Sequence, residues 1–347
     1  MADKGYFYRV AEATGTRFWI NNPTGSEAEQ AIAAGAIGCT TNPAYCATLL
    51  EREPAFLRGV IDEVLTTETD ADAAAERTYQ RAVLRIAGLF RPLYDQSKGR
   101  VGYAIIQGDP RHDSDPSFII AEALRNRAVA ANIMAKVPAN VAGAEEIDTM
   151  VAHDVPMCVT EVLGVGQAAY IWEAYGKAVA KHGKQPVFYV THITGILDRY
   201  LAKVASEQGV AIAPDVLGQA GYAVAREEYR LYRERGYLGA MMIGGALDPT
   251  YFTRMVGADM HVTIDWSSAA ALLAADGPVE REFEKPLPAG LVGELSEKLA
   301  DFRRSYDVDA LPPAQFADYG PLAFFRGMFL QRYGLLVEEL KQRIVSR

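Results

Sequence analysis

Short runs of hydrophobic residues alternate along this chain with longer segments in which apolar side chains recur every three or four positions. The short runs have the length of strands, and several are almost wholly apolar, as is typical of strands covered on both faces. The predicted strands cover residues 17–21, 37–41, 101–107, 133–137, 157–162, 187–191, 240–243 and 261–264. The amphipathic segments between them predict helices at 26–34, 70–90, 115–131, 142–153, 165–181, 196–208 and 221–235.

Eight strands that alternate with helices indicate an α/β architecture. Eight is also the number of parallel strands that closes a (β/α)8 TIM barrel. An open, doubly wound sheet is the competing interpretation, but no glycine-rich phosphate-binding motif follows the first strand. We therefore predict a single (β/α)8 barrel domain over residues 1–347, with the barrel itself at 17–265.

The chain continues well beyond the eighth predicted strand. Residues 287–306 predict a helix, 307–319 a proline-rich loop, and 321–345 a long amphipathic helix. We expect this helical extension, residues 287–347, to pack on the barrel. A lid over the barrel mouth and a share in a dimer interface are the functional alternatives.

Two local signals place helix ends. Ser26, with Glu29 three residues later, has the spacing of a capping box at the start of the first predicted helix. Pro92 follows the long helix predicted at 70–90, and a proline inside a helical pattern normally marks its end.

Composition narrows the class of protein. Half of the residues are hydrophobic, the formal net charge is −9, and no basic cluster suggests nucleic acid. No apolar run reaches the roughly 20 residues of a membrane span, and the polar N-terminus carries no signal-peptide core. The three cysteines fit no zinc pattern. We expect a cytoplasmic protein that acts on a small molecule without a metal or other cofactor, and its oligomeric state stays open between monomer and homodimer.

Lys136 lies in an otherwise apolar predicted strand, where lysine is uncommon. In TIM barrels, catalytic groups sit at the carboxyl ends of the strands. Burial there would lower the pKa of the amine, and a neutral amine can attack a ketone and form an imine. The alternative is a structural lysine that reaches the barrel rim or pairs with Glu161.

Five short motifs resemble the transaldolase family, and they occur in the same order. They are GCTTNP at 38–43, KVPA at 136–139, VT at 159–160, ILD at 196–198, and GY at 236–237 followed by MIGG at 242–245. The motifs lie between residues 38 and 245, and the resemblance extends over roughly residues 17–265, about three quarters of the chain. The resemblance implies a class I, Schiff-base aldolase barrel with Lys136 as the reactive amine.

The resemblance also marks departures in the acid–base residues. The family carries an Asp where Asn21 stands, and an amide does not transfer protons at neutral pH. Its transaldolases carry a Glu where Gln107 aligns, whereas its fructose-6-phosphate-aldolase branch carries Gln. That branch uses a Tyr near the position of His192, so we predict that His192 transfers the proton, helped by Thr160 through a water. Glu161 is the second candidate, although alternation would turn it away from the lumen if Thr160 points inward.

The phosphate-binding residues of the family are missing. Gly195 stands where the family has an Arg, and Ala246 and Asp248 stand where it has a Ser and an Arg. Losing these contacts predicts a substrate that is not phosphorylated at this end. Asp248 could bind a hydroxyl group or an amine, or simply cap the following helix. A relocated anion site at Arg111, His112 or Arg199 stays open as an alternative. The predicted substrate-binding residues are Thr41, Asn42, Cys158, Thr191, Ala246 and Asp248.

We therefore predict a lysine-dependent aldolase or transaldolase that forms or cleaves a C–C bond of a sugar-like, non-phosphorylated ketone. Two alternatives stay open. The first is a non-catalytic barrel that binds a sugar or metabolite. The second is an isomerase or dehydratase that keeps the imine but not the C–C chemistry.

Overall fold

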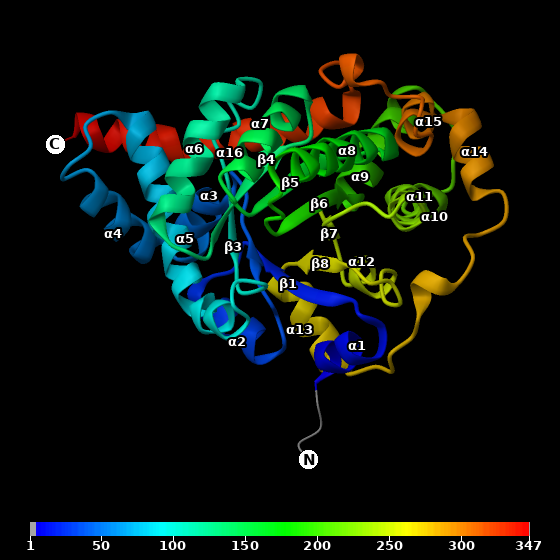
Figure 1. Cartoon of the computed structure of the whole chain (residues 1–347), viewed down its shortest axis with the longest axis horizontal. Coiled ribbons are helices and arrows are strands. Elements are labelled where there is room, and N and C mark those ends of the chain that lie inside the picture. Colours follow the sequence, from blue (N-terminus) through cyan, green and yellow to red (C-terminus); the bar gives the residue numbers. More distant parts are fainter. Residues whose placement is uncertain (1–4, 347) are drawn as a thin grey trace.

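The computed structural model describes residues 5–346 and contains a closed barrel of eight parallel strands, each hydrogen-bonded to the next and β8 to β1 (Figure 1). The predicted fold class is confirmed. The strands are β1 (Arg17–Asn21), β2 (Cys39–Thr40), β3 (Ala104–Gln107), β4 (Ile133–Pro138), β5 (Met157–Val162), β6 (Phe188–Ile193), β7 (Ala240–Gly244) and β8 (His261–Ile264).

The helices surround this barrel (Figure 1). The first half of the chain forms α1 (Tyr6–Thr14), α2 (Gly25–Ala33), α3 (Tyr45–Arg52), α4 (Pro54–Val64), α5 (Ala71–Gln96), α6 (Pro116–Val129) and α7 (Val141–Ala152). The second half forms α8 (Val165–His182), α9 (Thr194–Glu207), α10 (Pro214–Leu217), α11 (Ala220–Arg235), α12 (Thr250–Thr253), α13 (Trp266–Ala275), α14 (Leu291–Lys298), α15 (Ala300–Tyr306) and α16 (Gly320–Val345).

Some predicted helix ends were wrong. The capping box of α2 uses Thr24 and Glu27 rather than Ser26 and Glu29. Both pairs have the required spacing, and the helix begins at the earlier pair. Helix α5 continues through Pro92 to Gln96 instead of ending before it.

The C-terminal segment predicted as one helix at 287–306 is two helices. Leu299 has extended backbone angles and separates α14 from α15. Beyond the loop, α16 packs against α3, α5 and α9 and contacts β5, so it lies beside the barrel strands (Figure 1).

The barrel interior is filled by side chains below the strand ends. Trp19, Tyr103, Ile105, Met134, Cys158, Tyr189 and Met242 form one buried cluster there. Gly38 on the neighbouring chain segment has to be glycine, because a Cβ would lie 2.3 Å from the Trp19 ring. Because the barrel interior is packed with these side chains, a site has room only at the carboxyl ends of the strands.

Candidate active site

Lys136 lies at the end of β4, in register with Gln107 of β3 and Cys158 of β5. Its side chain is half-buried and lines the cavity at the barrel mouth. Among residues 5–346, its amine forms no hydrogen bond or ion pair. Burial lowers the pKa of Lys136, and the opposing influence of Cys158 and Glu161 is smaller. The lowered pKa increases the fraction of the amine that is neutral and nucleophilic.

The mouth cavity has a volume of about 200 Å³. Polar side chains from the strand ends line its floor around Lys136: Asn21, Thr40, Asn42, Thr191 and Thr263. The predicted sites at Asn21, Asn42 and Thr191 therefore come together with Lys136, and Thr40 and Thr263 join them without having been predicted as site residues.

Hydrogen bonds fix the polar floor of the cavity. The Thr40 hydroxyl donates to Oδ1 of Asn21 at 3.1 Å and lies 2.7 Å from the Thr263 hydroxyl. Asn42 is held by Asn22, whose Nδ2 donates to Oδ1 of Asn42 at 3.1 Å. These amide and hydroxyl groups can both donate and accept hydrogen bonds, as recognition of substrate hydroxyl groups requires.

Glu161 also lies near Lys136, contrary to the alternation argument. The register of β5 shifts between Val159 and Val162, and Glu161 has a φ of 66°, so an extra residue interrupts the alternation of the strand. Its carboxylate accepts a hydrogen bond from Nε2 of Gln107 at 2.8 Å. No glycine marks this bulge in the sequence.

Glu161, Gln107 and Lys136 together line a small cavity of about 20 Å³, which has the volume of about one water molecule. Burial, reinforced by Asp113, raises the pKa of Glu161 to about 7, although Lys136 and Gln107 act in the opposite direction. A carboxyl group in this state can both take up and release a proton near neutral pH.

The prediction that His192 serves this site is wrong. Its ring is fully buried outside the barrel lumen, where Nδ1 lies 2.8 Å from the Glu228 carboxylate and Nε2 lies 3.1 Å from the carbonyl of Gly221. His192 is in register with Ile243, which belongs to the core between strands and helices. Thr191, one residue earlier, is the one that faces the cavity.

Two predicted substrate-binding residues also lie elsewhere. The buried hydroxyl of Thr41 lies 2.8 Å from the Tyr79 hydroxyl and donates to the carbonyl of Ile105, so it faces the helices. Asp248 is exposed and accepts hydrogen bonds from the backbone and hydroxyl of Thr250 at 2.7 and 2.5 Å. Asp248 therefore forms a local turn before the short helix α12, whose N-cap residue is Pro249 without a side-chain cap, and it does not line the cavity.

Three further predicted residues differ in whether they line the cavity. Ala246 is half-buried and lines it. Cys158 is buried below it, with its sulfur 3.1 Å from the Thr191 hydroxyl. The Thr160 hydroxyl is buried and has no hydrogen-bond partner within the described part of the chain.

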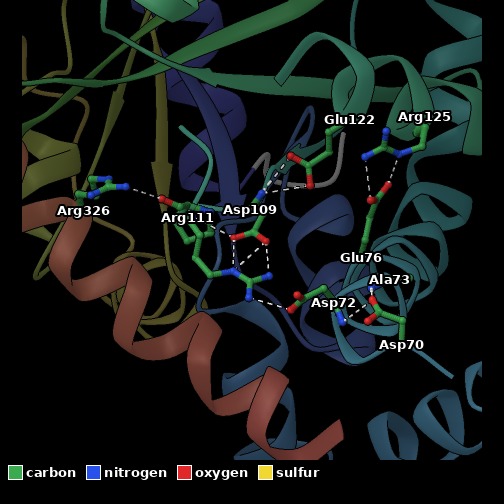
Figure 2. Close-up of polar contacts among 10 residues, drawn as sticks. Asp70, Asp72, Ala73, Glu76, Asp109, Arg111, Glu122, Arg125 and Arg326 are labelled. Carbon is green, nitrogen blue, oxygen red and sulfur yellow. Dashed lines mark hydrogen bonds and ion pairs between the residues drawn. The ribbon is translucent and has the colours of Figure 1, made fainter. Parts of the chain in front are cut away.

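The loop between β3 and α6 covers the small cavity beside Glu161 and is held by charged groups (Figure 2). Arg111 pairs with Asp109 at 2.5 Å, and the backbone N–H of Asp109 donates to Glu122 at 3.0 Å. Arg326 on α16 pairs with Asp113 of the same loop at 2.5 Å. This network connects α16 to the loop that borders the site.

Sequence reasoning missed the contribution of α16. Phe325, Met328, Phe329 and Arg332 line the mouth cavity together with Leu247 from the segment after β7. The lid alternative for the C-terminal helix allowed for such a role, but no motif identified the individual residues.

Between residues 5 and 346, no group of three or more His, Cys, Asp or Glu side chains is arranged to hold a metal ion. None of the helices in that range has both the length and the apolar character needed to cross a membrane.

Comparison with known proteins points to one family. Residues 18–308 match the family model described as transaldolase/fructose-6-phosphate aldolase. A transaldolase of Mycolicibacterium smegmatis is 26% identical over 240 residues, which cover 64% of this chain and 63% of that protein. A transaldolase of Thiobacillus denitrificans is 23% identical over 355 residues, which cover 89% of this chain and 94% of that protein. Transaldolase 1 of Streptomyces avermitilis is 27% identical, and the match covers 62% of its length.

Proposed function

This chain belongs to the transaldolase/fructose-6-phosphate aldolase family, and we propose that it is a lysine-dependent aldolase or transaldolase for a sugar-like, non-phosphorylated ketone. The observation that carries the proposal is the half-buried amine of Lys136, which lies at the polar floor of the mouth cavity and has no hydrogen-bond or ion-pair partner among residues 5–346. Its lowered pKa supports a neutral nucleophile.

In the proposed reaction, Nζ of Lys136 attacks the ketone carbon and a carbinolamine forms. Loss of water gives an iminium, which withdraws electrons from the neighbouring carbon atoms. Cleavage of the next C–C bond releases an aldehyde and leaves an enamine on the lysine. Water hydrolyses the reprotonated enamine in an aldolase, whereas a second aldehyde takes it up in a transaldolase.

We assign the proton transfers in this sequence to Glu161, since His192 lies outside the lumen. Glu161 lines the same small cavity as Lys136, and one water in that volume would connect the carboxylate to the reacting atoms. Gln107 acts as a positioning residue, because its Nε2 holds Oε1 of Glu161 at 2.8 Å. Asn21 and Asn42 provide hydrogen bonds to substrate hydroxyl groups.

The test is reductive trapping with dihydroxyacetone as the probe. Borohydride converts an iminium on lysine into a stable secondary amine, and mass spectrometry of the peptides locates the added mass. We expect labelling at Lys136 and none in a Lys136→Met variant. A Lys203→Met variant is the matched control, because Lys203 is exposed and pairs with Glu207. If none of several ketones labels the wild-type protein, the proposed imine is contradicted. That result would favour a barrel that only binds its ligand.

A further inference from the structure

The cavity above Lys136 has two chemically different surfaces. The floor is the ring of amide and hydroxyl groups at the strand ends. The wall and roof are apolar and consist of Ile193, Ile196, Leu247, Phe325, Met328 and Phe329. A ligand bound to the lysine would therefore have polar groups near the reacting carbon and an apolar surface around its far end.

The lining of this cavity offers little positive charge to an anion at the far end. Of the described residues that line it, Lys136 and Arg332 are the charged ones. Arg332 already donates from Nη1 to Oε1 of Glu51 at 2.8 Å, so its charge is balanced at the rim. Asp248, on the segment after β7, adds a negative charge nearby.

The start of α9 is a backbone feature at the cavity that would attract an anion, because N–H groups are exposed at a helix N-terminus. Here Leu247 lies over it. A Cβ added to Gly195 would be 2.7 Å from Cγ of Leu247 and 2.4 Å from the carbonyl oxygen of Gly245. The space that a cationic side chain at position 195 would need is therefore occupied by a leucine side chain and a carbonyl group.

We propose that the substrate carries an apolar alkyl or aryl group at the end remote from its carbonyl, bound between Leu247 and the α16 side chains Phe325, Met328 and Phe329. This assignment rests on the proposed imine with Lys136, because it defines the far end relative to the bound carbon. It goes beyond the absence of a phosphate by naming the group that takes its place.

The experiment measures the concentration of ketone that gives half-maximal borohydride labelling of Lys136. Three probes differ at the far end: hydroxyacetone, 1-hydroxy-2-hexanone and dihydroxyacetone phosphate. Burial of each added methylene is expected to lower this concentration by about fourfold at most. We therefore expect hexanone labelling to need at least tenfold less ketone than hydroxyacetone, and the phosphate ester to bind no better than hydroxyacetone.

The outcomes separate the two proposals. Labelling that favours the phosphate ester, or that does not depend on chain length, would overturn the apolar site while the lysine chemistry stands. Failure of every ketone to label Lys136 would overturn the proposed function and this inference with it.

A variant pair tests the named residue. Leu247 is 43% exposed, so Leu247→Arg should fold, and it would place a guanidinium over the start of α9. We expect it to improve labelling by the phosphate ester at least tenfold and to weaken the preference for the hexanone. Leu335→Arg is the control, since Leu335 is 48% exposed on α16 and does not line the cavity. A Leu247→Arg variant with the wild-type order of probes would contradict the assignment.

Discussion

Replacing Glu161 with glutamine separates imine formation from proton transfer. The amide oxygen of Glu161→Gln can still accept the hydrogen bond from Gln107 that now spans 2.8 Å, so the bulge should keep its geometry. The variant loses the group that exchanges protons. We expect borohydride labelling of Lys136 to persist, and proton transfer to fall by about 10²- to 10⁴-fold.

The assay follows hydrogen–deuterium exchange at the carbon atoms of dihydroxyacetone in D₂O by NMR. Exchange requires the iminium to lose a proton to a base and to regain a deuteron, and it needs no second substrate. Exchange by Glu161→Gln within about threefold of the wild-type rate, together with normal labelling of Lys136, would refute the role of Glu161.

The same variant should also change how the free energy of unfolding depends on pH. Burial raises the pKa of Glu161 from 4.5 to about 7 in the folded protein. Between these values the folded state keeps a proton that the unfolded state loses, so this group contributes less stability as pH rises. Since a tenfold change in proton affinity corresponds to about 1.4 kcal/mol, ionisation of Glu161 costs the folded state about 3 kcal/mol at pH 8. Glutamine does not ionise and avoids this cost.

Urea unfolding at pH 5 and pH 8 measures the effect. We expect the stability of Glu161→Gln relative to the wild type to increase by about 2 to 3 kcal/mol between these pH values. Glu338→Gln is the control, because Glu338 is exposed and pairs only with Lys341 among the described residues. If the variant and the wild type instead differ in free energy of unfolding by the same amount at both pH values, the carboxyl group of Glu161 is not held in its buried, protonated form.

Three further variants test neighbouring conclusions. His192→Leu should lower the free energy of unfolding by about 1–3 kcal/mol, because it removes the hydrogen-bond partner of the buried carboxyl group of Glu228. Deuterium exchange should stay within twofold of wild type, and a larger loss would return His192 to the mechanism. Gln107→Leu should move the exchange–pH profile to higher pH, because its hydrogen bond lowers the pKa of Glu161, and an unchanged profile would exclude that link. Gly195→Ala should cost about 1–3 kcal/mol in urea unfolding, since the added Cβ meets a carbonyl oxygen at 2.4 Å, and an unchanged midpoint would contradict the tight packing.

Much of the fold and part of the site could be predicted from the sequence. Each of the eight strands lies where its apolar run predicted, because strands covered on both faces need continuous hydrophobic side chains. Lys136 was recognisable as a lone cation inside such a run, and Asn21 and Asn42 as polar residues at strand ends. That Lys136 is the reactive amine stays a prediction until it is trapped.

The errors lie at the strand ends, where one residue decides which face a side chain takes. His192 and Thr41 are both adjacent to residues that line the cavity, Thr191 and Thr40. From sequence alone, either member of each pair could have pointed inward. The hydrogen bonds of His192 to the helix side of the barrel settle its direction.

By itself the sequence determined the barrel and the strand that carries Lys136, and it predicted that the family's phosphate-binding side chains are absent. Only the tertiary structure decided that a bulge in β5 brings Glu161 to the small cavity that Lys136 also lines, and that α16 covers the mouth cavity with apolar side chains. The physical reason is the sequence separation of the residues that determine each feature. Periodicity and residue type report on neighbours along the chain, whereas a register shift between strands and the docking of a distant helix depend on packing between segments far apart in the sequence.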